Sequence, residues 1–357
     1  MSKYITLLLA VCLCCAALTG FGGPALAELP LVYPAETVIG VMQLTQTQRE
    51  LAAFLYQPVL AGEETITLPD DTRYDDVGPA LQSLMLNYPE LFHLGRTYTI
   101  TYWQNEPDVA VSVRPSYRMD ARTAEDLRQQ LYEAALYLVA QDGTAVGLHD
   151  ALLQRVTYGG ADDMRHTAVG ALLYGTATCE GYAQALSLLY RMAGIPCGVI
   201  TGTAVSGFTG QTESHSWNVM NLGGFSLIDA TWNDQEGAGL NTYWYFGLST
   251  QQMAADHTPD RDMEVPACTE HAGWHLRMGR CAQTQEDVFR ALQALVVNGT
   301  PLNLRITDAA LYREISGDIG ALLDAYNTWA PEKCGFYGRY SYLLGDAQQC
   351  IIIRWTE

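Results

Sequence analysis

Positive charge is scarce in this chain of 357 residues, which has 20 Lys and Arg against 39 Asp and Glu and a formal net charge of −19. A strongly anionic surface is repelled by phosphate backbones and by anionic lipids. The balance therefore argues against nucleic-acid binding and against polybasic membrane binding. Only 17% of the residues are charged and 48% are hydrophobic, a composition that supports a packed core rather than disorder.

Apolar runs long enough to cross a membrane are also lacking. The longest run, residues 5–18, is shorter than the roughly 20 residues that a span needs. It follows Lys3 and precedes Ala25-Leu26-Ala27, a pattern typical of signal-peptide cleavage sites. We expect residues 1–27 to be a removed signal peptide, so that the mature protein is secreted or at the cell surface and has no membrane segment. A retained N-terminal anchor is the alternative.

Cysteine is sparse after this segment, and export would permit disulfides. The six cysteines are Cys179, Cys197, Cys268, Cys281, Cys334 and Cys350, so any disulfides would belong mainly to the C-terminal part. Their connectivity cannot be deduced from spacing. Zinc is conceivable at Cys268, His271, His275 and Cys281, but these residues lack the paired CxxC spacing. We expect no metal and no cofactor.

Helix and strand patterns divide the chain after the signal into three parts. We expect an N-terminal α+β module at residues 28–118, a central domain at 119–266 that opens with a helix, and a C-terminal α+β module at 267–357. In the N-terminal module, the patterns predict helices at 47–57 and 74–87 and strands at 65–68, 96–103 and 109–113.

The C-terminal module repeats the N-terminal order of helix, strand, helix, strand and strand. Ile66 aligns with Leu304, and Tyr74 aligns with Tyr312, both 238 positions later. We predict two copies of one module, although two unrelated short α+β segments would give a similar pattern. Flanking repeats are more often binding or packing units than catalytic ones.

Cys179 lies where a loop gives way to a helical pattern. Apolar residues then recur on one helical face up to Tyr190, and Gly194 and Pro196 end the pattern. A cysteine in the first turn of a helix is near the positive end of the helix dipole, which favours the reactive thiolate. The alternative is a buried core cysteine.

His215 and Asp229 lie on two runs that read as a β-hairpin around Leu222-Gly223-Gly224. Asp229 ends an apolar run and needs a partner, and a carboxylate beside an imidazole fixes its tautomer. The two side chains share a face of the sheet only if their paired positions have an even sum. We therefore predict a three-residue loop or a bulge in place of a two-residue turn.

Four motifs together resemble the transglutaminase-like superfamily in its bacterial exported form. They are Cys179-Glu180-Gly181-Tyr182-Ala183, Gly194-Ile195-Pro196, His215-Ser216-Trp217-Asn218 and Asp229-Ala230-Thr231-Trp232-Asn233-Asp234. The resemblance covers about residues 148–249. It implies an α+β papain-like core in which a helix carrying the cysteine packs on an antiparallel sheet, flanked here by the two small modules.

The same resemblance implies an acyl-transfer enzyme, either a cysteine peptidase or amidase or a transglutaminase. Cys179 would be the nucleophile, His215 the base and acid, and Asp229 the orienting carboxylate. One oxyanion donor would be the backbone N–H of Cys179. Candidates for further contacts with the oxyanion or the substrate are Tyr158, Tyr174, Glu180, Trp217 and Trp232, although core packing is an alternative for both tryptophans.

The expected partner is a peptide, a protein or a cell-wall stem peptide, and not a nucleic acid. Hydrolysis is favoured over cross-linking, because an exported enzyme works in water without an assured amine acceptor. A non-catalytic binding or scaffold protein of the cell surface, with a degenerate transglutaminase-like domain, is the second hypothesis. A metal-dependent hydrolase is the third.

Overall fold

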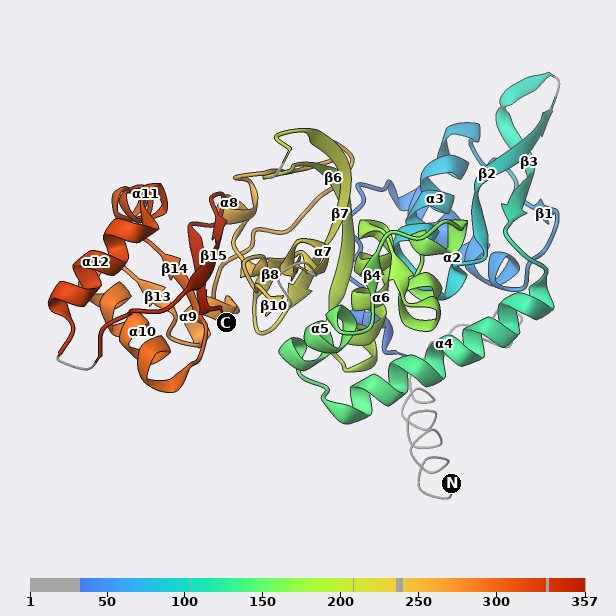
Figure 1. Cartoon of the computed structure of the whole chain (residues 1–357). Helices are drawn as coiled ribbons and strands as arrows, with labels where there is room; N and C mark the ends of the chain where they lie inside the picture. Colours follow the sequence, from blue (N-terminus) through green and yellow to red (C-terminus); the bar gives the residue numbers. More distant parts are fainter. Residues whose placement is uncertain (1–32, 104, 208, 236–239, 332–333, 357) are drawn as a thin grey trace.

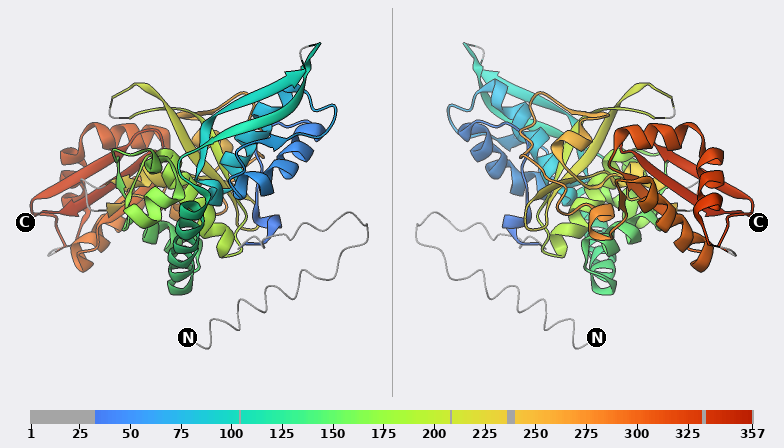
Figure 2. Two further views of the ribbon diagram at one scale, coloured as in Figure 1. Left: turned by 90° about the vertical axis from the view of Figure 1, so that its right-hand side faces the viewer. Right: turned by 90° about the vertical axis from the view of Figure 1, so that its left-hand side faces the viewer.

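The computed structural model describes residues 33–356, except 104, 208, 236–239 and 332–333. The expected signal peptide lies outside the described residues. The chain is mixed α+β, as predicted, and the N-terminal and C-terminal modules lie on opposite sides of the central domain (Figures 1 and 2). Within the described ranges, no helix combines the length and the apolar character that a membrane span requires.

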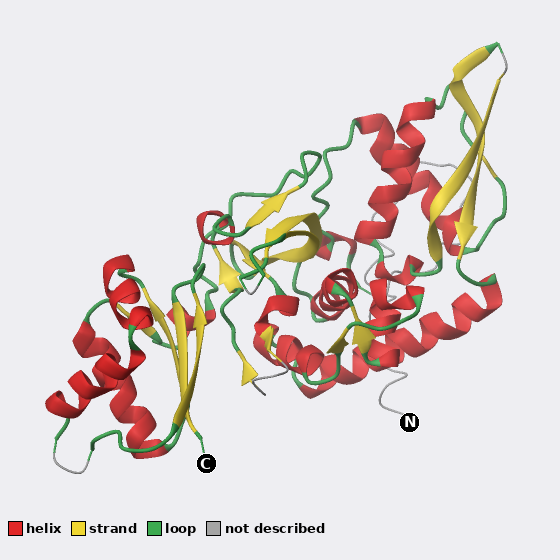
Figure 3. Ribbon diagram, turned by 45° about the horizontal axis from the view of Figure 1, so that its top comes forward, coloured by secondary structure: helices red, strands yellow, loops and turns green. Residues whose placement is uncertain are grey.

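The N-terminal module pairs two helices with a three-stranded antiparallel sheet of order β1-β3-β2. Its elements are η2 Ala35–Thr37, α2 Gln46–Leu60, β1 Ile66–Thr67, α3 Tyr74–Asn87, η3 Pro89–Leu91, β2 Leu94–Trp103 and β3 Glu106–Tyr117. Helix α2 begins at a capping box, in which Thr45 and Gln48 each accept the other's backbone N–H. The predicted helices and strands are confirmed, and β2 and β3 form a long hairpin that projects from the molecule (Figure 3).

The C-terminal module packs its helices on a four-stranded sheet of order β13-β14-β16-β15. Its elements are β13 Cys281–Ala282, α10 Gln285–Asn298, β14 Leu302–Ile306, α11 Ala309–Gly317, α12 Ile319–Trp329, β15 Tyr340–Gly345 and β16 Cys350–Trp355. Two helices follow β14 where the pattern predicted one. The break is at Asp318, whose side chain accepts the Ala321 N–H and so starts a new helix.

The two modules share more than their order of elements. Strands β14-β16-β15 have the same antiparallel arrangement as β1-β3-β2. Ile66 pairs with Val113 in the first sheet, and Leu304 pairs with Ile351 in the second, with both partners 238 positions later. The modules therefore agree in topology and in register, while their origin from one repeated unit stays a prediction.

The central domain places a buried helix beside a five-stranded antiparallel sheet of order β11-β8-β7-β6-β12. Its principal elements are α4 Ala121–Gln141, α5 Ala145–Leu153, α6 Cys179–Met192, β6 Cys197–Val205, β7 Thr212–Asn221, β8 Phe225–Ile228, β11 Phe246–Leu248 and β12 His257–Pro259. Helix α6 packs against β6, β7, α4 and α5, and its residues from Gly181 to Arg191 are all buried. The apolar face of this helix, which the sequence pattern predicted, therefore lies in the core.

Shorter elements complete the central domain and its link to the C-terminal module. They are β4 Thr157–Tyr158, η4 Asp163–His166, η5 Gly170–Tyr174, β5 Thr176–Ala177, α7 Ala230–Asn233, β9 Asp234–Gln235, β10 Leu240–Asn241, α8 Thr250–Met253 and α9 Trp274–Arg277. Two of them flank the candidate site directly, because η4 packs on α6 and α7 begins at Asp229.

The β7–β8 hairpin has the loop that the parity argument predicted. Asn221 pairs with Phe225, which leaves Leu222, Gly223 and Gly224 as a three-residue loop. Gly223 has a φ of 88°, a left-handed conformation that glycine adopts without strain. The Asn221 side chain accepts the N–H groups of both glycines, so this register is held locally. The prediction is confirmed, and positions 215 and 229 have the same parity on this sheet.

Gly202 lies at a crowded point of the sheet, opposite His215 and beside β12. An added Cβ would collide with the Thr258 carbonyl oxygen and the Trp217 ring. We therefore expect Gly202→Ala to lower the free energy of unfolding by about 1–3 kcal/mol, measured by urea denaturation. The control is Gly207→Ala, where an added Cβ meets no atom within 4 Å. Its cost should stay below about 0.5 kcal/mol, and equal losses in both variants would contradict the crowding.

Candidate active site

Cys179 is the first residue of α6, directly after the N-cap Thr178. Its thiol is free and half-buried. The first turn of the helix lies against η4, because Thr178 N–H donates to the Arg165 carbonyl at 2.9 Å. A side chain in place of Gly181 would collide with that same carbonyl, so glycine permits this close approach. The helix start predicted from the sequence is confirmed.

His215 meets Cys179 on one side and Asp229 on the other. It lies on β7 and is buried, and its Nε2 is 2.7 Å from Asp229 Oδ2. Since an ionised carboxylate only accepts, Nε2 donates. The Cys179 side chain is near enough to contribute to the raised pKa of this imidazole. The structure thus brings the three predicted residues into one contiguous group.

Asp229 is fully buried and uses its two oxygens for different purposes. Oδ1 accepts the Trp232 N–H at 3.1 Å and caps α7, while Oδ2 faces the imidazole of His215. The backbone N–H of Asp229 donates to the Tyr245 carbonyl at 3.0 Å. Two hydrogen bonds to the backbone therefore hold this residue in place, one through its side chain and one through its own N–H.

Burial and charge oppose each other at this pair. Burial alone would lower the pKa of His215, but the Asp229 charge and hydrogen bond, with a smaller contribution from Cys179, raise it to about 10. Burial alone would raise the pKa of Asp229, but His215 and His257 hold it well below its usual range. At neutral pH the pair is therefore imidazolium and carboxylate.

His257 joins this group and was missed by the sequence reasoning. Its Nε2 lies 3.2 Å from Asp229 Oδ2, and its Nδ1 lies 2.6 Å from Asp256 Oδ1. The residue is on β12, an edge strand that pairs with β6 and reaches the site only through the sheet. No local pattern marks it, because an Asp-His pair in a loop-like stretch is common.

The same three side chains are the described group best placed to surround a metal ion. The ligand atoms of His215, Asp229 and His257 lie within 4.8 Å of one another. However, one carboxylate oxygen accepts an N–H from both imidazoles, so each group is already satisfied by the others. We describe the cluster as a hydrogen-bond network.

Aromatic rings enclose the two imidazoles. The Trp217 ring is fully buried and stacks near His215, with ring centroids 6.2 Å apart. The Trp232 ring lies 5.0 Å from the His215 ring and 4.6 Å from the His257 ring. These rings exclude water from the network, which strengthens the charge interactions within it. Trp217 packs in the core, while Trp232 is half-buried beside the site.

The two candidate tyrosines differ in position. Tyr158 is 56% exposed on β4, and its pKa is raised first by burial and next by the nearby Cys179. It therefore lies within electrostatic reach of the sulfur. Tyr174 ends η5 and is 48% exposed. Across the part of the chain that the structure describes, no contact connects Tyr174 to Cys179 or His215.

Glu180 points toward the N-terminal module. It forms an ion pair with Arg96 of β2 and lies 3.6 Å from His166 Nδ1. Burial raises the pKa of Glu180, with Arg96 and Arg118 opposing that shift. The contact supports a structural role for this side chain, next in the chain to the nucleophile candidate.

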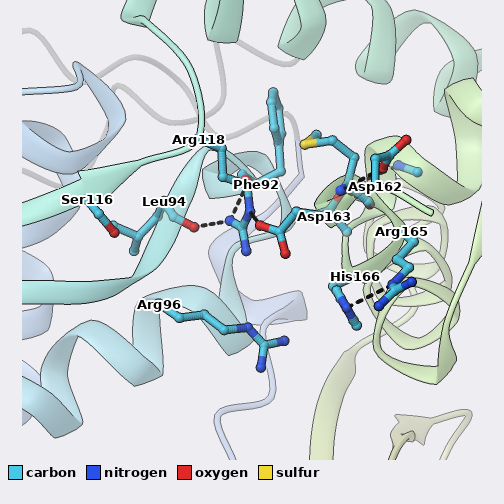
Figure 4. Close-up of polar contacts among 12 residues, drawn as sticks. Phe92, Leu94, Arg96, Ser116, Arg118, Asp162, Asp163, Arg165 and His166 are labelled. Carbon is cyan, nitrogen blue, oxygen red and sulfur yellow. Dashed lines mark hydrogen bonds and ion pairs between the residues drawn. The ribbon is translucent and has the colours of Figure 1, made fainter. Parts of the chain in front are cut away.

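A second ion pair strengthens the same junction. Arg118 Nε lies 2.6 Å from Asp163 Oδ2 of η4, and the same guanidinium donates to the carbonyls of Phe92 and Leu94 (Figure 4). A surface pocket here is lined by both arginines and by Glu180. The N-terminal module thus contacts both the first turn of α6 and the η4 turn against which it lies.

The four residues considered for zinc do not come together. His271 Nδ1 lies 2.7 Å from Thr269 Oγ1, and His275 Nε2 lies 2.8 Å from Asn303 Oδ1. Cys268 contacts the Pro266 carbonyl, with Sγ and oxygen 3.2 Å apart. Among the described side chains, these four form no metal-binding group, and Cys281 and the other five cysteines are free thiols.

Comparison with protein families identifies a match in the central part of the chain. The model of the Transglutaminase-like superfamily matches residues 138–230, which include Cys179, His215 and Asp229. This part of the chain is a transglutaminase-like domain. Among curated protein sequences, none is a significant match to the chain.

Solved structures are similar to parts of this chain. A proposed cysteine protease from Cytophaga hutchinsonii is 13% identical, with a TM-score of 0.25, and the match covers 38% of this chain and 61% of that one. The periplasmic domain of TgpA from Pseudomonas aeruginosa is 21% identical, with a TM-score of 0.23 and coverage of 35% and 55%. A TGase is 11% identical, with a TM-score of 0.24 and coverage of 39% and 45%. The chain therefore spans less than two thirds of each of these structures.

The raised pKa of His215 should make the stability of the transglutaminase-like domain depend on pH. A histidine with a higher pKa in the folded state stabilises the fold below its unfolded pKa of about 6.5. That contribution is lost as the pH rises through the folded value of about 10. We expect the free energy of unfolding to fall between pH 7 and pH 10, by up to about 1.4 kcal/mol per pH unit.

Asp229→Asn should flatten this decline, because it removes the charge that holds the proton on His215. Urea denaturation at successive pH values measures the slope. His275→Gln is the control: burial lowers the pKa of His275 to about 4, so this residue is neutral throughout the range and the slope should persist. Equal slopes in the wild type and Asp229→Asn would contradict the coupling.

Proposed function

We propose that this chain is an exported thiol enzyme that transfers acyl groups from amide bonds of peptides or proteins. Cys179 is the nucleophile, His215 the acid and base, and Asp229 the orienting carboxylate. The observation that carries the proposal is the meeting of a free thiol at the start of a buried helix with a buried imidazole–carboxylate pair. Export rests on the signal-like residues 1–27.

The reaction begins when the Cys179 thiolate attacks the amide carbonyl and a carbon–sulfur bond forms. His215 then donates its proton to the leaving amine as the carbon–nitrogen bond breaks, which leaves a thioester on the sulfur. In the second half, His215 accepts a proton from water or from an acceptor amine that attacks the thioester. The carbon–sulfur bond then breaks, the acid or the new amide leaves, and the Cys179 thiolate beside the His215 imidazolium is restored.

The oxyanion formed in both halves needs donors. The backbone N–H of Cys179 belongs to the first turn of α6, whose N–H groups have no acceptor within the helix. Tyr158 is the better supported candidate for a second donor, because it is exposed and close to Cys179. Tyr174 lacks that support, while Trp232 remains a candidate wall for the substrate.

Peptide amides of cell-wall stems or of proteins are the proposed substrates, and water is the favoured acceptor. An exported protein meets water at high concentration and has no assured supply of amines. A net charge of −19 disfavours nucleic acids as partners, and no membrane association is proposed once the signal is removed.

A binding or scaffold role is the second candidate, and the N-terminal hairpin favours it. Tyr102 and Trp103 on β2 are 50% and 61% exposed, and the ring of Tyr102 meets that of Tyr74 edge to face. Exposed aromatic rings on a projecting hairpin are typical of recognition surfaces. Under this second hypothesis, the flanking modules bind a partner and the central domain catalyses no reaction.

Alkylation separates the two candidates. Iodoacetamide at pH 7 should modify Cys179 at least about 10-fold faster in the folded protein than in the urea-unfolded chain, because a thiolate beside an imidazolium is the reactive species. His215→Ala should remove this advantage, while His275→Ala, at a buried histidine outside the site, should retain it. Peptide mass spectrometry gives the rate at each cysteine. Equal rates in the folded and unfolded wild type would favour the scaffold.

Turnover identifies the acceptor. Peptidoglycan stem peptides and casein are incubated with the wild type and with Cys179→Ser. Each incubation is run with and without a fluorescent primary amine as acceptor. The carboxyl and amine groups released by hydrolysis are then quantified. We expect hydrolysis of at least one substrate by the wild type, a loss of more than about 100-fold in Cys179→Ser, and little incorporation of the amine. Incorporation that exceeds hydrolysis would reassign the protein as a cross-linking enzyme.

A further inference from the structure

His257 is held between two carboxylates in the interior of the central domain. Its side chain is fully buried. Nε2 lies 3.2 Å from Asp229 Oδ2, and Nδ1 lies 2.6 Å from Asp256 Oδ1. On the far side, the Tyr245 hydroxyl donates to Asp256 Oδ2 at 2.6 Å. The chain of contacts therefore continues from Asp229 to a second carboxylate and a tyrosine.

The geometry determines the charge of this imidazole. Ionised carboxylates have no proton to give, so both ring nitrogens of His257 must donate, and an imidazole with two N–H groups is a cation. The neighbouring donors agree with this assignment, since Asp256 already accepts from Tyr245 and Asp229 accepts from Trp232. Burial alone would lower the pKa of His257, yet its hydrogen bonds to the two aspartates raise it.

We propose that His257 is a positioning residue of the active site, a buried imidazolium that orients the Asp229 carboxylate and offsets part of its charge. The inference rests on the proposed function, since His257 acts only through Asp229 and His215. Its own nitrogens face the two carboxylates and not the sulfur, so it has no direct part in the acyl transfer.

The charges alternate along the network. Asp256 is followed by His257, Asp229, His215 and then the sulfur, and each pair is of opposite sign when Cys179 is a thiolate. Without His257, the full charge of Asp229 would act on His215. The imidazolium would hold its proton more tightly and would be a poorer acid toward the leaving amine in the first half of the reaction.

The charged and titratable groups that face His257 come from the elements packed around it. Strand β7 contributes His215, with ring centroids 5.3 Å apart, and the segment before β11 contributes Tyr245, at 5.5 Å. The residue before β12 is Asp256, and α7 begins at Asp229. Strand β6 places the uncharged Ala204 opposite. The net effect of His257 on the reacting pair is therefore that of one added positive charge.

The loss of the His257 charge should shift the pH dependence of Cys179 alkylation. Removing a positive charge makes protonated forms more favourable at both reacting groups. The pH profile for alkylation of Cys179 should therefore move to higher pH as a whole in His257→Gln. A shift of its rising limb by about half to one pH unit is expected from the loss of one neighbouring charge.

The experiment measures iodoacetamide alkylation of Cys179 between pH 4 and pH 9 in the full chain. His275→Gln is the matched control, a buried histidine with one amide partner outside the network, and its profile should coincide with that of the wild type. An unshifted limb in His257→Gln, with the rate lowered equally at every pH, would mean a merely structural role and overturn the proposal.

A second measurement determines the charge of His257 directly in the wild-type protein. Nitrogen-15 NMR of labelled histidine should show both ring nitrogens of wild-type His257 protonated at pH 7. The signals of His257 are assigned by their absence from the spectrum of His257→Gln. A neutral ring with one N–H would overturn the proposal. The proposed function fails separately, if wild-type Cys179 alkylates no faster than in the unfolded chain.

Discussion

A buried carboxylate, that of Asp229, is the group on which the rest of the site depends. Removing a charge from water is costly unless hydrogen bonds and opposite charges compensate. Asp229 receives one backbone N–H and two imidazole N–H groups, and it caps a helix at the same time. Its cost of burial is thereby offset, and the same contacts hold His215 in one orientation beside the thiol of Cys179.

The scaffold around this carboxylate is divided between a helix and a sheet. Helix α6 fixes the sulfur, because its buried length is packed by β6, β7, α4 and α5 and its first turn lies on η4. The sheet fixes the imidazoles, since His215 is on β7 and His257 is on the edge strand β12, on either side of β6. Neither half contains the whole site, so its geometry depends on the packing of α6 against the sheet.

The N-terminal module takes part in that packing. Arg96 of β2 pairs with Glu180, and Arg118 bonds to Asp163 and to two carbonyls of its own module. These contacts reach the residue that follows Cys179. Exposed ion pairs add little stability, but Arg118 is largely buried and satisfies several acceptors at once. The module therefore does more than flank the domain, because it contacts η4 and the first turn of α6, the helix that carries Cys179.

The sequence by itself determined the local features of the site. The start of α6 at Cys179 depends on helical periodicity, and the three-residue loop that aligns positions 215 and 229 depends on glycine and on strand parity. These features act within a few residues. Only the tertiary structure decided that His257 meets Asp229 and that Arg96 meets Glu180. Those contacts depend on which strand pairs with the β6 edge and on how two modules pack. No short-range pattern encodes such a choice, since it is made by burial across the whole molecule.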